Sequence, residues 1–165
     1  MQSDATRWSQ LRNPGNAMDH QVLEEIAKTL NADAWNYTVF LRYIEVPLQK
    51  PTRKDIIIKT ALGADATLGG IQEVEKASVW PNLKDALLYV GDSRAGPAAA
   101  TMQSETLLAL MGVLEDEVRN LVDAASTTEL FWLQGGHPAY PVFWDFAYLI
   151  SREAGASILI GSSSD

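Results

Sequence analysis

Apolar residues that recur at intervals of three and four positions predict two helices in this chain. From Met18 to Asn31 the apolar positions share one face, and Asp19 is placed to cap the first turn. A longer stretch with the same spacing follows Pro97. We therefore predict one helix over residues 18–31 and one long helix over about residues 98–124, with Gly112 in its interior.

Aromatic and β-branched residues at a period of two predict strands. The segment from Trp35 to Val46 places every second residue on one face, namely Trp35, Tyr37, Val39, Leu41 and Tyr43. Three consecutive isoleucines favour a second strand over residues 56–62, although the same residues can equally open a helix. The glycines at positions 63, 69 and 70 then predict a loop.

The last part of the chain contains two apolar runs separated by the turn signal Arg152 to Gly155. We interpret these runs as a C-terminal β-hairpin whose first strand covers residues 141–150. A helix from Pro141 to Gly155 is the alternative, because some apolar residues in this segment also fit helical spacing. A short helix is also predicted after Pro81, ending at Gly91.

These elements alternate irregularly, without the strand–helix–strand order of a doubly wound sheet. For a chain of 165 residues we predict an α+β fold in which helices pack on one mostly antiparallel sheet. One domain is expected over residues 18–165, after a flexible N-terminal arm over residues 1–17. No apolar run approaches the roughly 18 residues of a membrane-spanning helix, so no membrane association is expected.

The chain contains no cysteine, and its charge is unevenly distributed. The missing cysteines exclude disulfides, thiolate nucleophiles and cysteine-ligated zinc, and they fit a cytoplasmic location. The formal net charge is −8, and the chain after Lys84 contains three arginines and no lysine but eleven acidic residues. Such a C-terminal half repels nucleic acid and attracts a basic protein.

Two groups of side chains resemble metal ligands in their spacing. His20 and Glu24 are four residues apart on the first predicted helix, and Glu105, Glu115, Asp116, Glu117 and Asp123 occupy the long one. Two ligands hold a metal weakly, and a Mg²⁺ site needs oxygen ligands from a second element. Because ordinary surface charges explain both groups, we expect neither a metal nor another cofactor.

The segment Leu130–Phe146 combines glycines and prolines with a dense set of aromatic residues. His137 lies in its loop, and Asp145 follows. A hydrolase or isomerase with His137 as general base and Asp145 as the orienting carboxylate is therefore the alternative function, with Tyr140 or Trp144 lining its pocket. No catalytic motif identifies a nucleophile, although hydroxyl groups are available on Ser104, Ser126, Thr127 and Thr128.

The uneven charge and the missing catalytic motif favour a small acidic binding protein over an enzyme. We expect it to cover a basic surface of a partner protein, as an inhibitor, an immunity-like antidote or an adaptor. The predicted contact residues are Asp116, Glu117, Asp123, Glu129, Trp132, His137 and Tyr140. A homo-oligomer that buries the exposed aromatic residues is a third interpretation.

Overall fold

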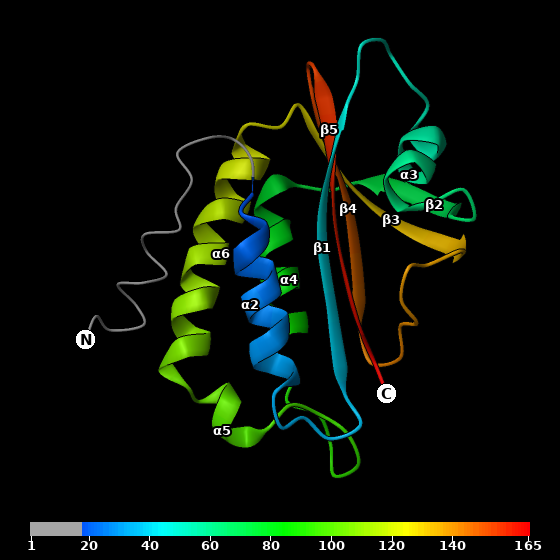
Figure 1. Cartoon of the computed structure of the whole chain (residues 1–165). Helices are drawn as coiled ribbons and strands as arrows, with labels where there is room; N and C mark the ends of the chain where they lie inside the picture. Colours follow the sequence, from blue (N-terminus) through cyan, green and yellow to red (C-terminus); the bar gives the residue numbers. More distant parts are fainter. Residues whose placement is uncertain (1–17) are drawn as a thin grey trace.

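The computed structural model describes residues 18–165, which fold around a five-stranded sheet (Figure 1). The strands lie in the order β1-β5-β4-β3-β2, and every neighbouring pair is antiparallel. The predicted α+β class is therefore confirmed. In chain order the elements are α2 (His20–Asn31), β1 (Thr38–Pro47), α3 (Lys54–Leu62), β2 (Thr67–Glu73), the 3₁₀ turn η1 (Lys76–Ser78), α4 (Val79–Leu87), α5 (Ala99–Met102), α6 (Glu105–Asp123), β3 (Thr127–Gly135), β4 (Asp145–Arg152) and β5 (Gly155–Ser164).

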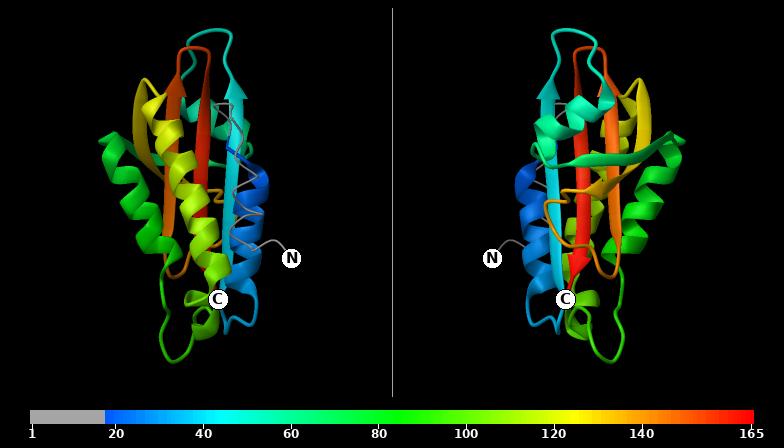
Figure 2. Two further views of the ribbon diagram at one scale, coloured as in Figure 1. Left: turned by 90° about the vertical axis from the view of Figure 1, so that its left-hand side faces the viewer. Right: turned by 90° about the vertical axis from the view of Figure 1, so that its right-hand side faces the viewer.

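Helices cover both faces of the sheet, so the protein has two hydrophobic cores. The larger core lies between the sheet and the layer of α2, α4 and α6 (Figure 2). The smaller core lies on the opposite face, beneath α3. Strand β5 is buried along nearly its whole length because its side chains enter both cores.

The two predicted helices are confirmed with one change of boundary. Asp19 caps α2 as expected, since its carboxylate accepts a hydrogen bond from the Gln21 amide at 2.8 Å. The long helix begins at Glu105, because the Ser104 hydroxyl accepts from the Leu107 amide and forms an N-cap there. The preceding part of the predicted range is the separate short helix α5.

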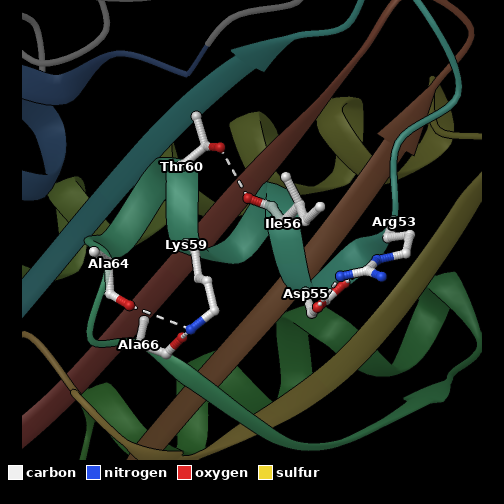
Figure 3. A network of polar contacts seen from close by, with 7 residues as sticks. All are labelled: Arg53, Asp55, Ile56, Lys59, Thr60, Ala64 and Ala66. Carbon is white, nitrogen blue, oxygen red and sulfur yellow. Dashed lines mark hydrogen bonds and ion pairs between the residues drawn. The ribbon is translucent and has the colours of Figure 1, made fainter.

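The strand favoured over residues 56–62 is wrong, since this segment is helix α3 (Figure 3). Only part of the isoleucine run faces the sheet: Ile57 and Ile58 are buried, whereas Ile56 is 43 % exposed. At its C-terminal end, Lys59 Nζ donates to the carbonyls of Ala64 and Ala66 at 3.2 Å and 2.9 Å. The helix satisfies its own backbone while covering the smaller core, and the three isoleucines alone carry no period that predicts this.

The loop predicted at Gly69 and Gly70 is also wrong, because both residues lie within β2. The indole of Trp132 on β3 lies against them, and a Cβ atom at Gly70 would be 2.1 Å from this ring. The glycines are therefore needed for close packing rather than for a turn.

The remaining segments follow their predictions more closely. The C-terminal hairpin is confirmed as β4 and β5, with the first strand at Asp145–Arg152. Helix α4 begins at Val79, which places Pro81 in the first turn, where no intrahelical N–H donor is required. The predicted arm over residues 1–17 lies outside the described residues. Within residues 18–165, no helix combines the length and the apolar character needed to cross a membrane.

Two glycine substitutions test this packing, and we expect them to change the free energy of unfolding in opposite directions. A Cβ atom at Gly161 would lie 2.5 Å from the Phe146 ring and 2.7 Å from Leu41, whereas one at Gly112 would meet nothing within 4 Å. We expect Gly161→Ala to lower the free energy of unfolding by about 1–3 kcal/mol through overpacking. Gly112→Ala should raise it by about 1 kcal/mol, because alanine favours a helix interior. Urea denaturation measures both, and a neutral Gly161→Ala would contradict the packing.

Candidate functional site

Helices α2 and α6 pack side by side on the same face of the sheet (Figure 2). Helix α6 carries five acidic residues and one arginine, Arg119. Helix α2 with its cap carries Asp19, Glu24 and Glu25 against Lys28. We call these two helices together the acidic face, because their eight carboxylates outnumber their two cations, Lys28 and Arg119.

The segment around α3, on the opposite side of the sheet, has a net positive charge. Four basic residues lie on α3 or just before it, namely Lys50, Arg53, Lys54 and Lys59, against the single carboxylate of Asp55 within residues 50–59. Arg53 pairs with Asp55 at 3.0 Å (Figure 3). Because the sheet separates these cations from α2 and α6, they do not neutralise the acidic face.

Glu117 is the least ordinary carboxylate of the acidic face. It lies half-buried where α6 meets the start of α2, and its Oε2 accepts a hydrogen bond from the Asp19 amide at 3.2 Å. Its Oε1 is buried without a hydrogen-bond partner among the described residues. Burial raises the pKa of Glu117 from 4.5 to about 7, and the Asp19 carboxylate adds to this effect, while the hydrogen bond from the Asp19 amide opposes it.

The structure brings together only part of the predicted contact set. Asp116, Glu117 and Asp123 share α6. Glu129 is 5 % exposed on β3 and forms an ion pair with Lys54 from α3, on the opposite side of the sheet. Glu129 is therefore occupied by an internal partner, and it lies apart from the other three carboxylates.

The three aromatic or imidazole members of the predicted set also lie away from the acidic face. Trp132 is half-exposed over the glycines of β2. His137 and Tyr140 belong to the loop between β3 and β4, where the His137 ring packs against Phe40 and Tyr140 is 79 % exposed. The structure thus places the carboxylates and the aromatic residues on separate surfaces.

The residues proposed for general base catalysis show a different arrangement. His137 Nδ1 lies 2.9 Å from both the amide and the carbonyl of Ala139, so it closes its own loop. Burial lowers the pKa of His137, and the nearby Asp145 carboxylate partly opposes this shift. Thr127 and Thr128 lie at the other end of β3 from this loop. Within residues 18–165, the geometry therefore provides a histidine and a carboxylate without a hydroxyl hydrogen-bonded to either.

Three further candidates for catalysis or metal binding make other contacts. Ser104 caps α6, and Trp144 Nε1 donates to the Tyr37 hydroxyl at 2.8 Å within the larger core. His20 lies 5.8 Å from the Tyr43 ring, measured between ring centroids. Among residues 18–165, no three side chains of the metal-ligating types are grouped so that they could hold an ion.

Sequence reasoning missed one cluster of exposed residues and half of the acidic face. Trp35 is 69 % exposed, and it forms two backbone hydrogen bonds with Gly96, beside exposed Val90. Glu24 and Glu25 lie outside the buried stripe of α2, so the helical period could have found them. They were hidden because the charges of the N-terminal half sum to nearly zero.

The raised pKa of Glu117 predicts a pH-dependent stability. The folded protein holds this proton more tightly than the unfolded chain, so the stabilisation is complete below about pH 4.5 and is lost as the pH rises through about 7. We expect the urea midpoint of the natural protein to fall from about pH 5 to about pH 8, and Glu117→Gln to remove much of that fall. Glu115→Gln is the matched control, since Glu115 forms an exposed ion pair with Arg119. Equal pH slopes for all three proteins would contradict the assignment.

Comparison with known proteins gave no further guide to this site. No protein family, no curated protein and no solved structure matched the chain. The function is therefore argued from the charges and the geometry alone.

Proposed function

We propose that this protein binds a basic partner protein through the acidic face formed by α2 and α6. The observation that carries the proposal is the net negative charge of α2 and α6, with the net positive segment of α3 on the other side of the sheet. A surface of one sign attracts an oppositely charged surface over a Debye length of about 8–10 Å and accelerates encounter.

We take the contact set from the carboxylates of α2 and α6 that are at least partly exposed and lie beyond the first turn of each helix. Glu24 and Asp123 are exposed, while Glu25 and Asp116 are partly exposed on the same two helices. These residues, with Glu117 at the junction of the helices, replace the earlier set that included Glu129 and the aromatic side chains. Because Glu117 ionises near neutral pH, the charge of the face varies in that range.

The physical role of such a face is to cover cations on another molecule. Carboxylates arranged on a rigid helical layer can occupy a cationic site that would otherwise bind phosphate. This supports an inhibitor, an antidote or an adaptor acting in the cytoplasm, and it disfavours nucleic acid as the ligand of this face. An inhibitor, an antidote and an adaptor would all use the same contact between the acidic face and a basic surface.

Charge reversal on the acidic face tests the proposal. We expect Glu25→Lys, Asp116→Lys and Asp123→Lys, combined in one variant, to reduce recovery of a basic protein captured from native lysate by about tenfold or more. Raising the salt concentration from about 0.05 M to about 0.5 M should release the same protein from the natural chain.

The control variant carries the same change of charge elsewhere. Glu73, Glu75 and Glu153 are exposed residues outside α2 and α6, and each is replaced by lysine. This variant should still capture the partner, and both variants should keep the circular dichroism spectrum of the natural protein. Equal loss in the two variants would show that net charge alone governs capture, which would refute the acidic face as the site.

A further inference from the structure

The two edges of the sheet are built differently. At the β2 edge, the pairing with β3 contains two register shifts, and the Trp132 indole packs against the two glycines of β2. At the other edge, β1 pairs with β5 over ten consecutive residues without a shift. Bulges of the first kind discourage another strand from pairing, whereas a long regular edge invites it.

The outer backbone groups of β1 can be identified from one contact. The Val39 amide donates to Asn31 Oδ1 at 2.6 Å, and the Val39 carbonyl accepts from Asn31 Nδ2 at 3.2 Å, so both groups point away from β5. In an antiparallel ladder the direction alternates from residue to residue. The amides and carbonyls of Leu41, Tyr43 and Glu45 therefore also point away from β5.

A groove lined by residues of β1 and α2 lies along this edge. Its volume is about 310 Å³, and its lining residues are His20, Leu23, Glu24, Leu41, Arg42, Tyr43 and Ile44. Both views of Figure 2 show α2 beside β1, beyond the outer edge of the sheet. An extended strand added to β1 would therefore have α2 as a wall along one of its faces.

We propose that this groove binds an extended segment of a partner protein, which adds to the sheet as a strand antiparallel to β1. Main-chain hydrogen bonds to Leu41, Tyr43 and Glu45 would supply the pairing, as in other cases of strand addition. The inference rests on the proposed function, because the extended segment is taken to be part of the same basic partner that binds the acidic face.

The side chains of the groove define the chemistry of the segment. Leu23 and Leu41 form the apolar lining beside Glu24 of α2, whereas the Arg42 guanidinium lies over the Phe40 ring, which packs on the opposite face of β1. Glu45 lies outside this lining, further along β1 on the same side as Leu41. Glu45 is about half-exposed and lies 3.8 Å from Arg152. Because strand side chains alternate, the fitting segment has an apolar residue with lysine or arginine two positions before and two positions after it.

A synthetic peptide tests this pattern directly on the full chain. The probe is acetyl-Thr-Lys-Thr-Leu-Thr-Lys-Thr-amide, titrated into ¹⁵N-labelled protein and followed by NMR. The amide signals of Leu41, Tyr43 and Glu45 should shift, and their hydrogen exchange should slow by about tenfold or more at saturation. Unchanged signals at these three residues would overturn the proposal.

Two N-methylated peptides distinguish strand addition from simple charge attraction. In an antiparallel pair, residues directly opposite one another lie on the same face of the sheet, and every second such pair is joined by two hydrogen bonds. The leucine of the peptide lies opposite a residue of β1 whose amide and carbonyl point outward, so the leucine N–H points to β1. Methylation of the leucine nitrogen should therefore weaken binding by about tenfold or more, whereas methylation of the threonine just before it should leave binding unchanged. Equal affinity of the two peptides would overturn the proposal.

Residues at the two edges of the sheet supply the matched protein variants. Glu24 lines the groove and Glu73 is exposed on β2 at the opposite edge, so Glu24→Lys should weaken the peptide by about tenfold while Glu73→Lys should have little effect. Equal effects of both variants would indicate general electrostatics and count against the groove. Loss of the partner on reversal of the acidic face, with no binding of the peptide, would leave the proposed function intact and remove only this inference.

Hydrogen exchange in the peptide-free protein tests whether residues 1–17 or a second copy of the chain occupies this edge instead. The amides of Leu41, Tyr43 and Glu45 should exchange rapidly in dilute protein that sediments as a monomer. Protection of these amides in the monomer would assign the edge to residues 1–17 of the same chain. Protection that appears only with dimerisation would assign the edge to a second copy. Either result would overturn the proposal.

Discussion

The burial of β5 on both faces is the constraint on which the rest of the structure depends. Its side chains enter the larger core on one face and the smaller core on the other, so each face requires its own cover. Helices α2, α4 and α6 cover one face and α3 covers the other. Removing this much apolar surface from water, at roughly 25 cal/mol per Å², is what holds the helical layers in place.

The same constraint separates the charges. A helix that covers a core turns its polar side outward, so the carboxylates of α6 and the lysines of α3 are directed to opposite sides of the sheet. The acidic face is therefore a consequence of two-sided burial combined with the composition of each helix. Helix α2 contributes to this face and also borders the outer edge of β1, which places the two proposed contacts next to each other.

Sequence periodicity predicted the elements whose pattern is local. Helix α2, strand β1 and the C-terminal hairpin have a clear period or turn signal. Helix α3 remained only the alternative to a strand, because three adjacent isoleucines show no period and their conformation depends on the sheet face that they cover. The burial of Glu129 could not be predicted for a related reason, since the direction of a strand side chain depends on register with β4 and on the position of Lys54.

The charge of a site depends on burial as well as on composition, and Glu117 shows why. A sum over the sequence counts it as a full negative charge, but burial at the junction of α2 and α6 raises its pKa to about 7. A cationic partner placed against this junction would favour the ionised carboxylate, so binding near neutral pH would release a proton. Ionisation of Glu117 would weaken the packing of α2 and α6, and contact with a positive surface would compensate for its charge. The buried carboxylate would thereby couple the stability of the two helices to partner binding.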